Sequence, residues 1–356
     1  MKRLWFALLI PISILLNILA HRFPHLTERY FSMGVYRGLA ASYGRVFGVL
    51  PFSVSQFLIV LLPLLGLGYL IFSVFVIITR NGQRLRCLGR LMAGVLAAAG
   101  VLAFMFTIFA GLNYARLPLS EKMGLDVRPS YVWELVSLAE RLADDVNSLS
   151  AKVSRDTSGV MQIEYGHLTL AREAQAAFRE AGKSFPWLTG YTPLVKPVLY
   201  SQFMSRLQIL GVYSPFTMEA HVNVHVPAYH IPATMLHEAA HFRGIMREDE
   251  ANFVAWLVAK NSGQAEFMYS GAMLAFVHTM RQLRLASPGC HRRIMDSLTA
   301  YVTADLRANS DYWQQFTGPL ATASTRVNDA YLRANRQDDG VASYGRMVDL
   351  LLAYFR

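Results

Sequence analysis

The sequence predicts a mostly α-helical membrane protein, in which N-terminal transmembrane helices precede a second domain with a small β element. Three observations predict this class. Hydrophobic residues make up 53% of the 356 residues and charged residues only 16%, whereas about a quarter of a soluble domain is charged. Long uncharged apolar runs occur within residues 1–112. Residues 113–356 instead show helical periodicity, interrupted by one alternating stretch.

Three apolar runs, at residues 4–20, 57–78 and 91–112, predict the transmembrane helices. The second and third each hold 22 residues without a charge, and a span needs about 20 apolar residues. The first run is shorter and follows Lys2 and Arg3, as the core of a signal peptide would. The chain after it lacks a small-x-small cleavage motif, so we predict a retained membrane helix.

The basic residues predict how these helices cross the membrane. Residues 1–112 hold ten Lys and Arg and one acidic residue, Glu28. The loop between the second and third runs carries four arginines and no acid: Arg80, Arg84, Arg86 and Arg90. By the positive-inside rule this loop is cytoplasmic, so residues 113–356 lie outside the cell membrane. That domain has 24 basic and 23 acidic residues, and this balance argues against a nucleic-acid surface.

The second domain is predicted to be mainly helical. Apolar periodicity indicates helices over 131–153, 168–182, 199–210, 233–242, 249–261, 264–285, 290–308, 322–336 and 343–355. Residues 219–226 alternate instead, which is typical of a half-buried strand with a polar face made by Glu219, His221, Asn223 and His225. The two cysteines exclude a disulfide framework and a cysteine zinc cluster.

One short motif carries the chemistry: His237-Glu238-Ala239-Ala240-His241. Two histidines four residues apart lie on one helical face, where both imidazoles can bind one Zn²⁺. Zinc accepts imidazole nitrogen readily and acidifies bound water toward neutral pH. Glu238 adjoins the first histidine and is the expected general base. The alternative is a structural pair of histidines without a metal.

The third metal ligand is expected from the acidic residues that follow. Gly244 can turn the chain, and a carboxylate at the start of the next helix can then reach the metal. Glu248 and Asn252 share a helical face, so Glu248 is the predicted ligand and Asn252 a hydrogen-bond partner of a ligating histidine. The alternatives left open are Glu250, Asp249 and His230.

These motifs carry a resemblance to a known class of enzymes. The His237–His241 motif followed by Glu248-x-x-Ala251-Asn252 resembles the gluzincin (HExxH) zinc metallopeptidases, including membrane proteases of the CAAX-prenyl-protease type. Those proteases have Asp at the position of Asn252, and here only six residues separate His241 from Glu248. The resemblance implies a zincin-like α+β fold for residues 113–356, Zn²⁺ as cofactor, and metallopeptidase activity.

A second resemblance covers nearly the whole chain. The segments 211–223, 237–253 and 339–351 and the N-terminal apolar runs resemble bacterial membrane proteins grouped as domain of unknown function 3810. This resemblance implies an HExxH peptidase-like fold, but the family has no assigned substrate.

The expected function is that of a membrane-anchored hydrolase acting outside the cell membrane on a peptide or protein substrate. Tyr213, Glu219 and Asn223 lie near the predicted strand and are candidates for substrate binding. Tyr331 and Tyr344 are candidate donors to an oxyanion. Two alternatives remain open: a metal-dependent hydrolase of a non-peptide amide, and a non-catalytic metal-binding sensor.

The predicted topology can be tested with reporter fusions. A reporter that is active only outside the cytoplasm, fused after Arg356, is expected to be active, since three spans carry the second domain across the membrane. A reporter active only in the cytoplasm is expected to be active at Gly82. The opposite pair of results would place the HExxH motif on the cytoplasmic side.

Overall fold

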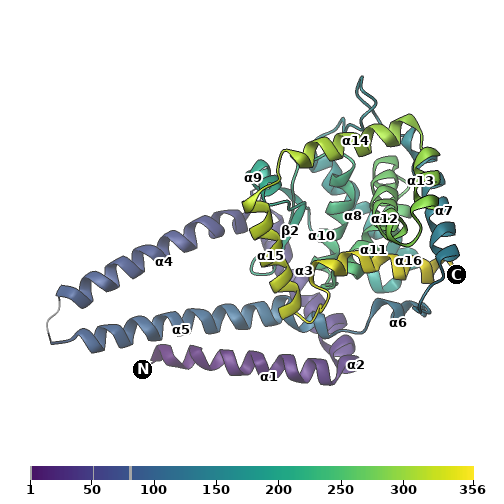
Figure 1. The fold of residues 1–356 in the computed structure, drawn as a ribbon. Coiled ribbons are helices and arrows are strands. Elements are labelled where there is room, and N and C mark those ends of the chain that lie inside the picture. Colours follow the sequence, from purple (N-terminus) through teal and green to yellow (C-terminus); the bar gives the residue numbers. More distant parts are fainter. Residues whose placement is uncertain (1, 51, 80–81) are drawn as a thin grey trace. The chain divides into compact units, whose positions relative to one another are not determined.

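The structure is a computed structural model that describes residues 2–50, 52–79 and 82–356 (Figure 1). It divides into two units. The N-terminal unit runs to Arg116 and includes Ser214–Glu219, and the C-terminal unit comprises Leu117–Tyr213 and Ala220–Arg356. Arg80, one of the four arginines of the predicted cytoplasmic loop, lies outside the described residues.

The N-terminal unit contains three helical segments long and apolar enough to cross a membrane among the described residues. They are Leu4–Arg22, formed by η1 (Lys2–Leu8) and α1 (Leu9–Arg22), then α4 (Val54–Thr79) and α5 (Arg84–Phe109). α5 begins seven residues before the predicted run, so it includes three of the arginines. The prediction of apolar helices near the N-terminus is confirmed.

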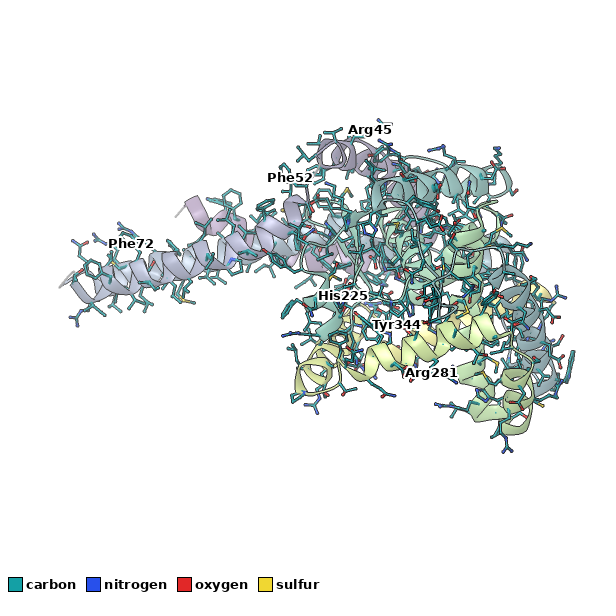
Figure 2. The ribbon with its side chains drawn as sticks, turned by 90° about the horizontal axis from the view of Figure 1, so that it is seen from above. Arg45, Phe52, Phe72, His225, Arg281 and Tyr344 are labelled. Carbon is teal, nitrogen blue, oxygen red and sulfur yellow. The ribbon has the colours of Figure 1, made fainter. Side chains whose placement is uncertain are left out.

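The surfaces of these helices suit a lipid environment. No residue of α4 is buried within the protein, and side chains such as Phe72 project outward along it (Figure 2). Phe72 is 63% exposed. A helix that is apolar all round and has no buried residue is unfavourable in water, whereas hydrocarbon accommodates it. The side of the membrane on which each end lies stays a prediction.

Short helices connect the first two spans: α2 (Pro24–Leu26), the π-helix η2 (Thr27–Val35) and α3 (Tyr36–Gly48). A buried ion pair joins η2 to the chain after α5, with Arg116 Nη2 2.9 Å from Glu28 Oε1. Beside it, the Ser32 hydroxyl donates to Asn113 Oδ1 at 2.8 Å, within η3 (Gly111–Ala115). Glu28, Arg116 and Ser32 thus each have a buried polar partner.

Residues Ser214–Glu219 are held by the start of α4. The Glu219 carboxylate accepts hydrogen bonds from the backbone N–H groups of Val54 (3.1 Å) and Ser55 (2.8 Å). The first N–H groups of a helix have no partner within it, and the helix dipole favours an anion there. Glu219 therefore caps the N-terminus of this apolar helix.

The C-terminal unit consists mainly of helices around one core (Figure 1). Its helices are α6 (Leu119–Met123), α7 (Val132–Ser150), α8 (His167–Ser184), η4 (Pro186–Leu188), α9 (Ser201–Arg206), α10 (His230–Phe242), α11 (Glu248–Lys260), α12 (Ala265–Ala286), α13 (Pro288–Asp296), α14 (Ala300–Gln314), α15 (Pro319–Ala334), η5 (Gly340–Arg346) and α16 (Met347–Phe355). α12 packs against α7, α10 and α11. The mostly helical class is confirmed.

Three predicted helices differ from the structure, and the one expected over 343–355 consists of the end of η5 followed by α16. The helix expected over 199–210 shortens to α9. The one expected over 290–308 divides into α13 and α14, because Thr299 adopts an extended conformation and its side chain accepts a hydrogen bond from Val302 N. Capping of this kind starts a new helix, whereas the spacing of the apolar residues alone predicted one continuous helix.

A small sheet of three strands has the order β1-β3-β2. β1 (Lys196–Pro197) pairs parallel with β3 (Glu219–Val222), with Lys196 opposite His221, and β2 (Gly211–Ser214) lies on the other side of β3. The expected half-buried strand with an exposed polar face is wrong. Glu219, His221 and Asn223 are at most 3% exposed, because β3 is the central strand and other elements cover both faces.

Candidate metal centre

The candidate metal centre is built where α10 ends and α11 begins. Gly244 has φ of 77°, a conformation in which a side chain would be strained. Its N–H donates to the His241 carbonyl at 2.9 Å, and Ile245 N donates to Ala240 O at 3.1 Å. These bonds close α10 and reverse the chain. α11 therefore starts with Glu248 beside the last turn of α10.

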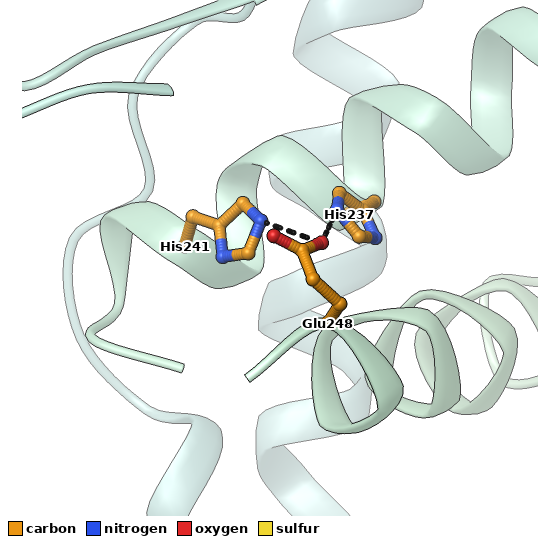
Figure 3. Close-up of side chains that lie close together, drawn as sticks. All are labelled: His237, His241 and Glu248. Atoms are coloured by element: carbon orange, nitrogen blue, oxygen red, sulfur yellow. Dashed lines mark ion pairs between the residues drawn. The ribbon is translucent and has the colours of Figure 1, made fainter. Parts of the chain in front are cut away.

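Three side chains converge at this turn (Figure 3). Glu248 Oε2 lies 3.1 Å from His237 Nε2 and 3.4 Å from His241 Nε2. The two imidazole rings are 4.6 Å apart and nearly perpendicular. Among the described residues this is the one group of three or more His, Cys, Asp or Glu side chains with ligand atoms within 4.8 Å of one another.

The donor atoms fit a zinc ion in number, type and spacing. Two imidazole nitrogens and one carboxylate oxygen form a ligand set found in zinc hydrolases, with the fourth position open. Bonds of about 2.0–2.1 Å in tetrahedral geometry place ligand atoms about 3.3 Å apart, close to the separations here. Glu248 Oε2 is buried, and apart from the two imidazole nitrogens it has no polar partner among the described residues. The positive charge of a metal ion would compensate the negative charge of this buried oxygen.

Hydrogen bonds orient the ligands. His241 Nδ1 lies 2.7 Å from the Ile245 carbonyl, so its Nε2 is directed at Glu248. The N–H of Glu248 donates to Gln337 Oε1 at 3.1 Å, which fixes the first residue of α11. These hydrogen bonds form without a metal, so the protein itself sets the positions of the ligand side chains.

The charges of the cluster shift the pKa of its members. Burial lowers the pKa of His241, but the Glu248 carboxylate outweighs it and raises the value to about 9. Burial raises the pKa of Glu248, yet the neighbouring histidines bring it well below its usual range. The metal-free centre therefore holds a carboxylate beside a protonated imidazole. Metal binding must displace that proton.

Glu238 lies beside this cluster without belonging to it. It is 4% exposed, and burial raises its pKa to about 7 against the lowering effect of His237 and His241. Its Oε2 is buried without a hydrogen-bond partner among the described residues. A carboxylate whose pKa is about 7, with one oxygen that accepts no hydrogen bond from the described residues, is suited to accept a proton.

Gly211, at the start of β2, packs directly against the side chain of Glu238. A Cβ atom at Gly211 would lie 2.4 Å from Glu238 Oε1 and 2.7 Å from its Cγ. Any other residue would displace the carboxylate or the strand. The importance of Gly211 could not be predicted from the sequence, because it depends on a contact between residues 27 positions apart.

The open alternatives for the third ligand have other partners. Glu250 Oε1 accepts hydrogen bonds from Leu119 N at 2.7 Å and from Arg247 at 3.0 Å. His230 Nε2 lies 2.7 Å from Asn309 Oδ1. Asp249 is outside the cluster of ligand atoms. The arrangement favours Glu248.

Tyr344, on η5, also reaches the cluster. Burial and the charges of Glu248 and Glu238 raise the pKa of its hydroxyl well above the usual range. Asn328 Nδ2 on α15 lies 3.5 Å from that hydroxyl. Asn252 was expected to contact a ligating histidine, but its amide donates to the Tyr344 carbonyl at 3.4 Å. Asn252 therefore anchors η5 to α11.

The three predicted substrate-binding residues lie in different parts of the structure, and only one of them is close to the metal-ligand cluster. Tyr213 lies near the cluster, with its ring 6.5 Å from that of His241. Asn223 is fully buried and donates to Ser205 Oγ and the Ile209 carbonyl, both at 3.0 Å. Glu219 belongs to the N-terminal unit, where it caps α4. The structure thus brings only Tyr213 to the ligands.

Another residue that the sequence analysis missed is His278 on α12. Burial lowers its pKa to about 4, and the charges of Arg281 and His237 act in the same direction. His278 is therefore neutral near the centre at neutral pH. Because His278 lies in an ordinary amphipathic helix, the sequence around it does not indicate a functional role.

Comparison with known proteins identifies a family but no characterised relative. The family model described as "Protein of unknown function (DUF3810)" matches residues 31–352. That range includes every residue of the cluster. No curated protein and no solved structure matches the chain significantly.

Metal content tests the centre. In detergent-purified protein, His237→Ala, His241→Ala and Glu248→Ala are each expected to lower bound zinc to well below one per chain, since each removes one of three ligands. Glu250→Gln is the matched control, because it keeps the side-chain size and lies two residues from Glu248. Equal zinc in all four variants and the wild type, measured by elemental analysis, would exclude the centre.

Proposed function

This chain belongs to the DUF3810 family of proteins of unknown function, and from its buried cluster we propose that it is a membrane-anchored, zinc-dependent metallopeptidase. One observation carries the proposal: two histidines and a carboxylate meet with metal-ligand spacing, and a separate buried carboxylate stands beside them. A purely structural metal site needs no such second carboxylate.

His237, His241 and Glu248 are the residues that would hold the ion. Zinc bound there would lower the pKa of a coordinated water and polarise the carbonyl of the scissile bond. The ligand side chains are 9–12% exposed, so the surrounding protein excludes most water. Low water content strengthens every charge interaction in the site.

Glu238 is the general base. It accepts a proton from the attacking water and passes that proton to the amine nitrogen of the leaving group. In the metal-free centre burial raises the pKa of Glu238 to about 7, so this carboxylate is a stronger base than an exposed glutamate, as the role requires. Gly211 lets β2 pack on the carboxylate and hold it in place.

Tyr344 is proposed to donate a hydrogen bond to the oxyanion that develops on the substrate carbonyl. Tyr344 is half-buried and its hydroxyl interacts with Glu248 and Glu238, and its raised pKa keeps the proton on oxygen at neutral pH. A neutral donor next to the reacting carbon stabilises charge that appears only in the transition state.

The proposed fold of the C-terminal unit is zincin-like. An HExxH helix, a following helix with a glutamate ligand and a small sheet beside them support the gluzincin resemblance. The apolar helices support a location in the cell membrane. The arginine-rich loop supports an extracytoplasmic catalytic unit and a substrate on that side.

Glu238→Gln separates catalysis from metal binding. The substitution keeps the size of the side chain and removes the proton acceptor. We expect zinc content and fold to be unchanged while cleavage falls by at least about 10²-fold, the usual scale for general-base catalysis. The measurement compares extracytoplasmic peptide termini across the proteome in wild-type and variant strains, which requires no prior substrate.

The Glu250→Gln strain is the control for effects of an acid-to-amide change nearby. The peptidase proposal fails if the wild-type and Glu238→Gln strains show the same termini under all growth conditions while zinc contents are equal. A hydrolase of a non-peptide amide or a metal-binding sensor would then be preferred.

Tyr344→Phe tests the oxyanion donor, using a substrate found from the altered termini. Loss of the hydroxyl is expected to lower kcat by about 10²-fold with little change in KM, because the hydrogen bond forms in the transition state. Tyr331→Phe, on the neighbouring α15, is the matched control. A fall in zinc affinity instead of kcat would show that Tyr344 only orients Glu248.

A further inference from the structure

The candidate metal centre is closed to a peptide. Glu238, His241 and Glu248 are 4%, 8% and 7% exposed. A peptide carbonyl oxygen that a zinc ion polarises lies about 2 Å from the ion, so the substrate backbone has to come into contact with the ligands. A main chain cannot reach side chains that are more than nine-tenths buried unless part of the covering protein moves. One of the elements that cover the ligands must therefore move before a substrate binds.

Residues 307–346 include part of this cover but no part of the hydrophobic core. The core of the C-terminal unit draws on residues 119–306 and on α16. Only two of the 16 residues of α15 are buried, and neither belongs to that core. η5 nevertheless brings Tyr344 to the ligands. This stretch thus covers the centre without the apolar packing that fixes the other helices.

α15 and η5 are joined to each other. α15 packs chiefly against η5, and the Asp329 carboxylate on α15 accepts a hydrogen bond from Val341 N at 3.0 Å. The chain enters α15 through Gly318, whose φ of 142° favours glycine. Residues 319–346 can therefore move as one body about this point. We call them the flap.

Hydrogen bonds to α11 hold the flap over the centre. Glu248 N donates to Gln337 Oε1 at 3.1 Å, and Asn252 Nδ2 donates to the Tyr344 carbonyl at 3.4 Å. Water can replace such bonds, so each contributes little net stability. Gln337 Nε2 and Ser343 Oγ are buried without a hydrogen-bond partner among the described residues, and opening would give both atoms access to water. The closed position is thus held by polar contacts that can open and form again.

We propose that the flap opens to admit a substrate and closes over it, so that Tyr344 reaches the scissile carbonyl only after the substrate has bound. Closure of this kind excludes water and completes the catalytic groups with the substrate in place. The inference rests on the proposed metallopeptidase, because it assigns a means of access to the same centre. It also implies that the flap limits exchange of the metal, which can be measured without a substrate.

Cross-linking of the closed flap tests the proposal in the full-length, detergent-purified protein. A Cβ atom at Gly345 would lie 3.0 Å from Gln282 Nε2 on α12. Gly345→Cys and Gln282→Cys therefore place two thiols within reach of a short bifunctional methanethiosulfonate. Cys290→Ser removes the half-buried native thiol, while Cys87 is buried. The rate of zinc transfer to excess pyridylazoresorcinol is measured before cross-linking, after it, and after reduction.

Zinc transfer is expected to slow by about tenfold when the flap is cross-linked, a common size for coupling between two sites, and to recover on reduction. The two single-cysteine proteins, treated in the same way, are expected to keep the wild-type rate. Equal rates in the cross-linked and the reduced protein would overturn the proposal.

A pair of asparagine variants gives an answer that does not depend on cross-linking. Asn252→Ala removes a bond between α11 and the flap, so zinc transfer is expected to be faster by about fivefold, the effect of one hydrogen bond, with zinc content at saturation unchanged. Asn328→Ala is the matched control, since its amide lies 3.5 Å from the Tyr344 hydroxyl within the flap. The proposal fails if both variants release zinc at the same rate.

The outcomes separate the flap from the metallopeptidase. Protein that binds zinc but releases it at one rate in every variant refutes the flap alone. Unchanged peptide termini in the Glu238→Gln strain refute the peptidase, and the release rates still decide on the flap. Wild-type protein that binds no zinc refutes the centre and the flap together.

Discussion

The approach of Glu248 to His237 and His241 is the interaction on which the arrangement of the candidate centre depends. An acid and two imidazoles, nearly removed from water, are stable only if their charges compensate one another or a metal. The positive φ of Gly244, the Ile245 carbonyl and the Gln337 side chain all serve this approach. The sharp turn between α10 and α11 is thus a structural requirement of the centre.

The centre draws on distant parts of the C-terminal unit. Gly211 brings β2 onto Glu238, and η5 delivers Tyr344 from near the C-terminus. Asn252, on the same helix as Glu248, binds the backbone of η5. The base, the ligands and the donor therefore come from three segments, α10, α11 and η5. Their relative positions depend on the core that joins these segments, since loops alone would not hold them to a fraction of an ångström.

The small sheet shows how sequence patterns and burial can disagree. The alternation of residues 219–226 indicated a polar face in water, but the structure buries Glu219, His221 and Asn223. Each is satisfied by a group that periodicity does not reveal, such as the N-terminus of α4 for Glu219. Conversely, α9 exposes Phe203 and buries Ser201 and Ser205. Both exceptions lie beside groups contributed by other elements, where tertiary contacts override local pattern.

The sequence by itself determined the apolar helices, the mostly helical class and the shared helical face of His237 and His241. These follow from local spacing, because 22 uncharged residues and histidines four apart act within one helix. Only the tertiary structure decided that Glu248 rather than Glu250 faces the histidines, that Glu219 caps α4 and that Gly211 and Tyr344 adjoin Glu238. Those outcomes depend on contacts between residues far apart in the chain, and side-chain type carries no information about which distant group will be the neighbour.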